Sequence, residues 1–415
     1  MQKPMPPIPV YLSLAMMNCM SSVAASMHAK NGLINWNPAL KAKAENLQEN
    51  LAKLSAVSAA DFILEVQKQS SERFLSLLDG LQKYTQTTSP EIAPTPYKTI
   101  WSEGTTSLRD YSPDSPPQSP PQAGGRILVP SPVYGGGLGR GNNILLIPSL
   151  INRSYILDLT ENTSLVKYLR NTGFRPFMLD WGEPGEKEKS FGIENYVSRV
   201  NKAIEQIEGK ITLVGYCMGG LMALASALNN QKKLNGLALL ATPWDFHSPD
   251  TDRLQFGMQE IQNLQDMLSK MEIIPKELIY LMFYFLDPWP VHSKYSRTHD
   301  DSDLLAREHW VHDGIAMARK VAEESFIEMS CYNVTQNLKW RILDKIIDPA
   351  NIQIPTFVAI PSFDRVVPPL CARPLAELIP GATTISCPTG HVGMIVGKNA
   401  REHLWAPLVK WLSKT

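Results

Sequence analysis

The stretch ITLVGYCMGG, residues 211–220, constrains the fold of this chain more than any other segment. A run of β-forming residues leads through a glycine and a tyrosine to a cysteine, and two more glycines follow closely. Glycines on both sides of Cys217 permit a tight turn from a strand into a helix, because side chains there would crowd the neighbouring backbone. The turn is predicted to hold Cys217 at the N-terminus of a helix starting near Met218, where the helix dipole favours a thiolate. The alternative is an inert, buried cysteine.

Short apolar runs like this one recur along the chain and alternate with helix-like segments. The predicted strands are Ile144–Pro148, Arg175–Asp180, Ile211–Gly215, Gly236–Ala241 and Thr356–Pro361, with helices predicted at Asn195–Glu208 and Met218–Asn229. Continuous apolar strands of this length are typical of a parallel sheet covered on both faces. The chain is therefore predicted to be an α/β protein, and residues 100–111 are predicted to form a first β-hairpin.

Composition changes along the chain suggest how it is organised. Residues 1–95 are predicted to form a helical N-terminal region, and residues 96–415 a catalytic domain. A flexible, proline-rich surface loop is predicted over 112–125, directly after the hairpin. A long segment between the last two predicted strands, about 245–345, is rich in aromatic residues. Its position in the sheet predicts a lid over the active site.

The N-terminal region is predicted to contain three helical stretches. An amphipathic helix is expected over residues 12–27, where apolar side chains recur at helical spacing: Leu12, Met16, Met20, Val23 and Met27. A cleaved signal sequence and a membrane anchor are the alternatives. Residues 38–84, with a cap at Asn37-Pro38, are expected to form a helical hairpin packed on the main domain. The alternative is a pair of helices that binds a partner or a surface.

Charge and cysteine content exclude several classes of protein. Lys and Arg together number 40, as do Asp and Glu, so the formal net charge is zero. No dense basic stripe is visible, and a nucleic-acid partner is not expected. The five cysteines are scattered and include no C-x-x-C pair, which argues against a disulfide framework or a zinc knuckle. A reducing cytoplasm fits this pattern best.

Two late segments supply partners for a catalytic cysteine. His391 lies between glycines in TGHVG, after a further predicted strand at 383–386, where a general base is expected. Asp364 follows the strand Thr356–Pro361 closely and is the preferred orienting acid, with Asp245 as its rival. The order Cys217, Asp364, His391 is that of the α/β-hydrolase fold. An oxyanion hole is expected from the backbone amide of Met218 and that of Leu150 or Ile151.

These segments together resemble the polyhydroxyalkanoate synthases. The resemblance rests on IPSLINRSYILDL, NTSLVKYLRNTGF, FMLDWGEPG, ITLVGYCMGG, FDRVVPP and TGHVGMIVG, which cover about a third of the chain. The lid region lacks the tryptophan-asparagine stretch associated with that family, so a divergent branch is implied. The resemblance implies that Cys217 accepts the acyl group, that His391 generates its thiolate, and that Asp364 orients His391 or activates the incoming hydroxyl.

The predicted activity is acyl transfer that polymerises 3-hydroxyacyl-CoA, with the CoA thioester as substrate and no metal or cofactor. The alternatives are a thioesterase or polyester depolymerase of the same fold, and a non-catalytic scaffold at a granule or membrane surface. A cytoplasmic location is expected, with association to such a surface, a homodimer and a partner subunit left open. Two other motifs are set aside: His309 and His312 as a polar helix face, and the glycine-rich residues 135–141 as a flexible loop.

Overall fold

The computed structural model describes residues 5–36, 41–87, 92, 95–112, 142–248, 258–286 and 302–415. The chain divides into two compact units, one formed by residues 1–90 with 280–312 and the other by residues 91–279 with 313–415. The predicted lid segment thus contributes to both units. Three predicted features lie outside the described residues: the Asn37-Pro38 cap, residues 113–125 of the proline-rich loop, and the glycine-rich residues 135–141.

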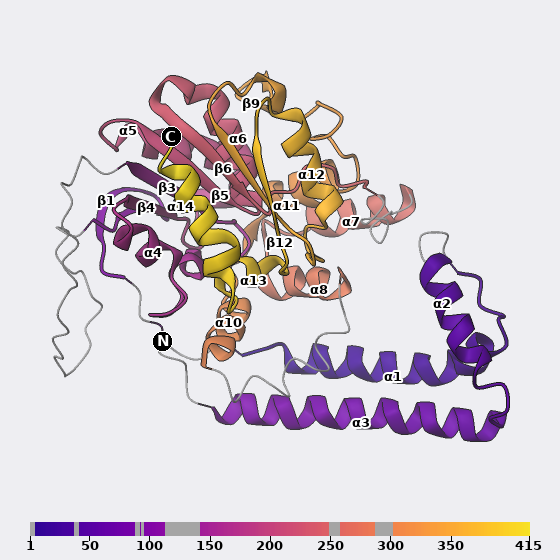
Figure 1. The fold of residues 1–415 in the computed structure, drawn as a ribbon. Coiled ribbons are helices and arrows are strands. Elements are labelled where there is room, and N and C mark those ends of the chain that lie inside the picture. The colour runs from indigo at the N-terminus through magenta and orange to yellow at the C-terminus, as the bar shows by residue number, and fades with distance from the viewer. Residues whose placement is uncertain are drawn as a thin grey trace. The chain divides into compact units, whose positions relative to one another are not determined.

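The larger unit is built on an eight-stranded sheet with the order β1-β2-β4-β3-β5-β6-β11-β12 (Figure 1). Its strands are β1 (Lys98–Glu103), β2 (Thr106–Asp110), β3 (Asn143–Ile147), β4 (Arg175–Asp180), β5 (Ile211–Tyr216), β6 (Leu234–Leu240), β11 (Thr356–Pro361) and β12 (Thr383–Cys387). The strands from β4 to β12 in this order are parallel, whereas β1 and β2 form an antiparallel hairpin that pairs with β4. The parallel sheet and the hairpin predicted from the sequence are confirmed.

Helices cover both faces of the sheet (Figure 1). On one face α4 (Leu165–Asn171) lies beside the C-terminal segment that ends in α14 (Ala406–Leu412), because Tyr168 packs against Trp405 with ring centroids 5.4 Å apart. On the other face α5 (Ile193–Glu205) packs against α6 (Met218–Asn230). This double cover explains why the central strands β3, β5 and β6 are almost wholly apolar and buried.

Shorter elements complete the chain. The remaining helices are α7 (Met258–Ser269), α8 (Lys276–Leu286), α10 (Ser302–His312), α11 (Arg319–Ala322), α12 (Pro369–Leu378) and α13 (His391–Val396), with π-helical segments at η7 (Glu323–Met329) and η9 (Arg401–Trp405). Short 3₁₀ turns lie at η2 (Ser154–Leu157), η3 (Glu188–Ser190), η4 (Gln231–Lys233) and η8 (Pro349–Asn351). Two small sheets pair β7 (Ile273–Ile274) with β8 (Met317–Ala318), and β9 (Arg341–Ile342) with β10 (Lys345–Ile346).

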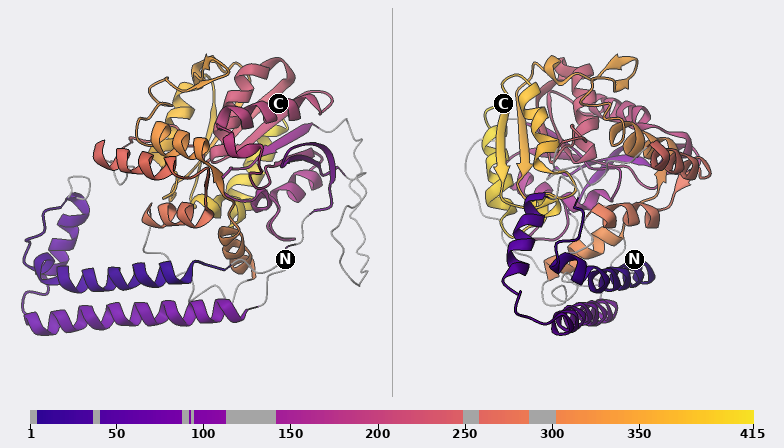
Figure 2. Two further views of the ribbon diagram at one scale, coloured as in Figure 1. Left: turned by 180° about the vertical axis from the view of Figure 1, so that it is seen from behind. Right: turned by 90° about the vertical axis from the view of Figure 1, so that its right-hand side faces the viewer.

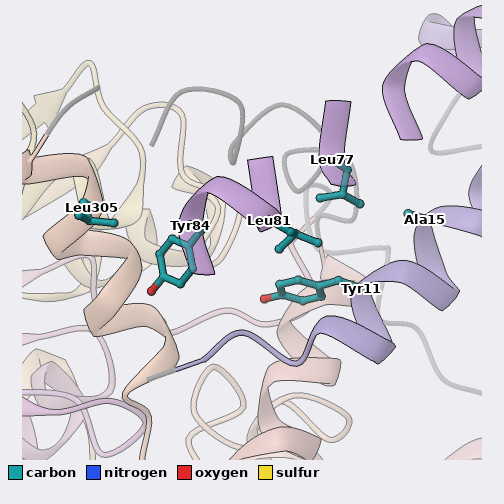
Figure 3. Close-up of a cluster of buried hydrophobic side chains, with 6 residues drawn as sticks. All are labelled: Tyr11, Ala15, Leu77, Leu81, Tyr84 and Leu305. Atoms are coloured by element: carbon teal, nitrogen blue, oxygen red, sulfur yellow. The ribbon is translucent and has the colours of Figure 1, made fainter. Parts of the chain in front are cut away.

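The smaller unit contains α1 (Ile8–Lys30), α2 (Lys41–Ala52) and α3 (Ala59–Gln86). Helices α1 and α3 lie side by side in opposite directions, as both ribbon figures show (Figures 1 and 2). A buried apolar cluster joins them with α10 (Figure 3); its members are Tyr11, Ala15, Leu77, Leu81, Tyr84 and Leu305. The predicted helices are present, but α3 pairs with α1 rather than mainly with α2.

The apolar residues at helical spacing in the first helix do not share one environment. Leu12 packs against the buried cluster, whereas Met16 and Met20 are 57% and 64% exposed, and the buried apolar side chains of α1 are Tyr11 and Ala15. The small side chain of Ala15 lets α3 approach closely, and this contact leaves the long methionines outside. By length and composition α1 is also apolar enough to cross a membrane, with a mean hydropathy of 1.4 over its most apolar window.

A buried ion pair connects the β1–β2 hairpin to the loop that follows β4. Arg199 on α5 donates to Glu188 at 2.5 Å and to Thr106 at 2.7 Å, and both charged side chains are almost fully buried. Glu188 also accepts the backbone N–H groups of Thr105 and Gly185. Because the Arg199 side chain is only 1% exposed, loss of Glu188 would leave the buried charge of Arg199 without compensation.

We therefore expect Glu188→Ala to lower the free energy of unfolding by about 3–5 kcal/mol, as is typical when one member of a buried ion pair is removed. Urea denaturation followed by circular dichroism measures the change. Glu186→Ala is the matched control, because the Glu186 side chain is 93% exposed and pairs with Lys189 at the surface; its cost should stay below about 1 kcal/mol. Equal costs for the two variants would contradict the prediction.

Candidate active site

Cys217 occupies the turn between β5 and α6 with a left-handed backbone, φ 55° and ψ −127°. A non-glycine residue adopts this conformation only when its surroundings enforce it. Two hydrogen bonds do so here, since the Cys217 N–H donates to the carbonyl of Leu240 at 2.8 Å and its own carbonyl accepts from Gly220 N–H at 2.9 Å. The sharp turn that the sequence predicts is therefore present, and the cysteine is 7% exposed.

The glycines around Cys217 are required by close backbone approach. A Cβ at Gly215 would lie 2.5 Å from the Cα of Gly220, and one at Gly219 would lie 2.6 Å from the carbonyl oxygen of Pro148. A Cβ at Gly220 would overlap the side chain of Thr242. The turn is therefore packed on all sides and has no slack.

His391 and Asp364 are in direct contact. The Nδ1–H of His391, the first residue of α13, donates to Oδ2 of Asp364 at 2.6 Å. The other carboxylate oxygen accepts the N–H groups of Val366 and Val367, each at 2.8 Å. Both oxygens are thus fixed, and the Asp364 side chain is fully buried. Since Cys217, Asp364 and His391 follow β5, β11 and β12, parallel strand ends bring all three to one edge of the sheet.

The electrostatic surroundings of His391 favour its protonated form. Burial by itself lowers the pKa of the imidazole, but the charges of Asp364 and Cys217 outweigh burial. Hydrogen bonds to the same two side chains add to their effect, so the pKa of His391 lies well above its usual 6.5. An imidazole that touches both a carboxylate and a thiol can take a proton from the thiol and be held in one orientation by the carboxylate.

The rival acid Asp245 has other hydrogen-bond partners. Its Oδ1 accepts the backbone N–H of His247 at 3.0 Å and the side-chain amide of Asn333 at 2.8 Å. These bonds give Asp245 a role in fixing the chain after β6. Of the two carboxylates considered, Asp364 is the one that contacts His391.

Tyr216 is a further residue that contacts His391, and the sequence analysis did not identify it. Its hydroxyl donates to the backbone carbonyl of His391 at 3.3 Å, and the two rings pack with centroids 5.2 Å apart. Burial raises the pKa of Tyr216 well above 10, so the hydroxyl remains a donor. The signal was present in the sequence, because Tyr216 is the residue between Gly215 and Cys217 in the turn motif.

The predicted oxyanion donors lie on two adjacent segments. Met218 is the first residue of α6, so its N–H lies among the groups left unpaired at a helix start. Leu150 and Ile151 follow β3 on the neighbouring strand. The N–H of Ile151 donates to Ser149 Oγ at 3.3 Å, which favours Leu150 over Ile151 as the second donor.

Of the other four cysteines, Cys371 and Cys387 are buried, whereas Cys19 and Cys331 are partly buried. Burial raises the pKa of Cys371 to about 12 and that of Cys387 to about 11, and it also raises the pKa of Cys19 and Cys331. These thiols are therefore protonated at neutral pH and poor nucleophiles.

No cluster of three or more His, Cys, Asp or Glu side chains suited to a metal occurs among the residues that the structure describes. His309 and His312, interpreted above as a polar helix face, lie on α10 and are both buried. His312 lies 3.9 Å from Glu308 and packs edge-on against Tyr11, Tyr84 and Tyr280.

Comparison with known proteins agrees with this geometry. Residues 142–398, more than half of the chain, match the model of the alpha/beta hydrolase fold. The chain therefore belongs to the alpha/beta hydrolase fold family. Among solved structures it is similar to an enol-lactonase from Burkholderia xenovorans, with 17% identity, a TM-score of 0.45 and coverage of 77% of this chain and 100% of the lactonase.

Within that family the chain resembles the poly(3-hydroxyalkanoate) polymerases, as its motifs predicted. It is 26% identical to the polymerase subunit PhaC of Haloarcula marismortui over 65% of this chain, and 26% identical to that of Synechocystis over 83% of this chain and 91% of the relative. The alignment spans 60% of the length of the Haloarcula protein and 58% of that from Haloferax mediterranei.

The His391–Asp364 contact should make stability depend on pH. The pKa of His391 is higher in the folded protein than in the unfolded chain. Its contribution to the free energy of unfolding is therefore complete below about pH 6.5 and is lost as the pH rises through the pKa of the folded state. We expect the stability advantage of the wild type over Asp364→Asn to shrink across that window by up to about 1.4 kcal/mol per pH unit. Urea denaturation at several pH values measures this difference. Asp245→Asn is the control, and a wild-type advantage over Asp364→Asn that is constant with pH would contradict the assignment.

Proposed function

We propose that this protein is an acyltransferase that polymerises 3-hydroxyacyl-CoA through a thioester on Cys217. The observation that carries the proposal is the arrangement of Cys217, His391 and Asp364 at one edge of the sheet, with the cysteine held on a strained turn. Similarity to poly(3-hydroxyalkanoate) polymerases over 83% of the chain supports the choice of substrate.

In the first half-reaction His391 takes the proton of the Cys217 thiol, and the thiolate attacks the carbonyl carbon of the acyl-CoA. The amides of Met218 and Leu150 hold the negative oxygen that forms. The carbon–sulfur bond to CoA then breaks, and CoA leaves as a thiol with the proton from His391. One thioester replaces another, so the acyl group stays activated and no redox change occurs.

In the second half-reaction the 3-hydroxyl of another acyl unit is the nucleophile. His391 takes its proton as the hydroxyl oxygen attacks the Cys217 thioester, and Asp364 holds the imidazole in place. The carbon–sulfur bond breaks, an ester forms, and Cys217 regains its proton from His391. A thiol suits this chemistry because its thioester keeps the free energy that drives ester formation. Only protons and an acyl group move, so the proposal requires no metal or prosthetic group.

The decisive experiment supplies the purified protein with 3-hydroxybutyryl-CoA and follows both CoA release and the acyl product. We expect CoA release with formation of an insoluble oligomeric ester. Cys217→Ala should lower the rate by at least about 1,000-fold, because the nucleophile is lost. Cys331→Ala is the matched control, since it removes a thiol from a partly buried site where the sulfur donates to the carbonyl of Phe326 at 3.1 Å.

The product distinguishes the rival functions. CoA release that yields only monomeric 3-hydroxybutyrate would make the protein a thioesterase, and cleavage of added polyester would make it a depolymerase. Absence of Cys217-dependent release, with a range of acyl chain lengths, would favour a non-catalytic scaffold.

We also propose that the protein works in the cytoplasm at the surface of a polyester granule, with α1 as the contact. Support comes from three methionines on α1 that are each more than half exposed: Met16, Met17 and Met20. Flexible methionine side chains adapt well to irregular apolar surfaces. The relatives are named as subunits, so a partner subunit is part of the proposal, and a homodimer is the alternative.

Replacement of all three methionines by Gln should weaken binding to isolated polyester granules in a sedimentation assay, because apolar contact area is lost. Leu64→Gln with Leu75→Gln is the control, as both leucines are exposed on α3. Unchanged sedimentation of the methionine variant, or an equal loss in the control, would argue against α1 as the contact. Binding to phospholipid vesicles in preference to granules would point to a membrane instead.

A further inference from the structure

The turn after β3, which contains the expected oxyanion donor Leu150, is attached to a segment far away in the sequence. Asn152 forms a β-bridge with Gly314, and the N–H of Ile315 donates to the carbonyl of Ile151 at 3.4 Å. Both segments belong to the larger unit. The second of these contacts, at 3.4 Å, is longer than a typical N–H···O hydrogen bond.

Charged side chains reinforce this attachment. Arg153 Nε donates to Oδ1 of Asp313 at 3.0 Å, and the hydroxyl of Tyr155 donates to Oδ2 of the same carboxylate at 3.0 Å. A second nitrogen of Arg153 donates to Glu183, after β4, at 2.5 Å. The Asp313 side chain is only 16% exposed, so its ion pair is poorly screened by water and stronger than a surface pair.

The start of the turn is fixed by Trp181, whose indole N–H donates to the carbonyl of Pro148 at 3.0 Å. Leu150 itself is only 5% exposed and lies near Trp181, Ile315 and Ala316. Trp181 therefore holds the chain just before Leu150, and Arg153 holds it just after Leu150.

We propose that Arg153, held by Asp313, Tyr155 and Glu183, is a positioning residue that sets the Leu150 amide for oxyanion binding. The inference rests on the proposed function in so far as Cys217 forms an acyl-enzyme. Arg153 itself touches no reacting atom. Its effect is confined to reactions of Cys217 in which a carbonyl oxygen becomes negative, since only these reactions need the amide.

Three reagents separate this role from other roles. Para-nitrophenyl acetate acylates a thiol through an oxyanion and carries no phosphate. 3-Hydroxybutyryl-CoA forms the same oxyanion and carries phosphates. Iodoacetamide alkylates a thiol without any oxyanion. The rate at which each reagent modifies Cys217 is measured in the wild type, in Arg153→Met and in Arg153→Lys.

Arg175→Met is the matched control. Arg175 also pairs with a carboxylate, that of Asp110 at 2.8 Å, but it lies at the opposite end of β4 from Glu183.

Arg153→Met is expected to slow acylation by both acyl reagents by about 10- to 100-fold, as misplacement of an oxyanion donor does. Alkylation by iodoacetamide should change by less than about twofold, which also shows that the variant is folded. Arg153→Lys should recover part of the loss, since the ammonium can still reach a carboxylate but lacks the planar fork. Arg175→Met should react like the wild type with all three reagents.

Other outcomes would overturn the proposal. A loss confined to the CoA thioester would mean that Arg153 binds phosphate, and an equal loss of alkylation would mean a general structural role. An unchanged rate of acylation in Arg153→Met would show that Arg153 does not position the Leu150 amide. If the wild type reacts with para-nitrophenyl acetate but not with the CoA thioester, the proposed function is refuted. The positioning role is then tested by the rate at which para-nitrophenyl acetate acylates Cys217 in the wild type and in Arg153→Met. A wild type that accepts neither acyl reagent would refute both.

Discussion

The left-handed backbone of Cys217 is the constraint on which the rest of the site depends. It is stable only because β5 and β6 are paired so that the Leu240 carbonyl meets the cysteine N–H, and because α6 approaches β3 more closely than any side chain at Gly219 would allow. The strain amounts to about 1–3 kcal/mol, which packing of the sheet and helix offsets. This conformation places the thiol at the N-terminus of α6, next to the segment that follows β3.

The parallel arrangement of the strands determines which side chains lie at the same sheet edge as this thiol. Because β11 and β12 run in the same direction as β5, the residues that follow them arrive at the same edge, which brings Asp364 and His391 together. Backbone amides fix the carboxylate, the carboxylate fixes the imidazole, and Tyr216 supports the imidazole from the turn itself. The histidine is therefore held from two directions by groups whose positions follow from the sheet.

The sequence predicts the features that depend on local patterns and misses those that depend on distant partners. Strands of the sheet could be predicted because burial on both faces makes them continuously apolar, and Asp364 and His391 because they lie just after strands. The packed face of α1 could not, since it is set by Leu77, Leu81 and Tyr84 on α3. Gly220 needs to be glycine because of Thr242, at the end of another strand. Arg153 and Asp313 are separated by 160 residues, and no sequence motif predicts that they pair.

The surroundings of the other four cysteines affect how the protein responds to oxidants. Peroxides attack thiolates rather than thiols, and burial keeps these four sulfurs protonated at neutral pH. A sulfenic acid formed on Cys217 thus finds no reactive thiol among the five cysteines of the chain with which to close a disulfide. In the proposed acyl transfer, oxidant and acyl donor compete for the sulfur of Cys217. An acyl chain bound there would protect the protein, and the form without an acyl chain is the one open to oxidation.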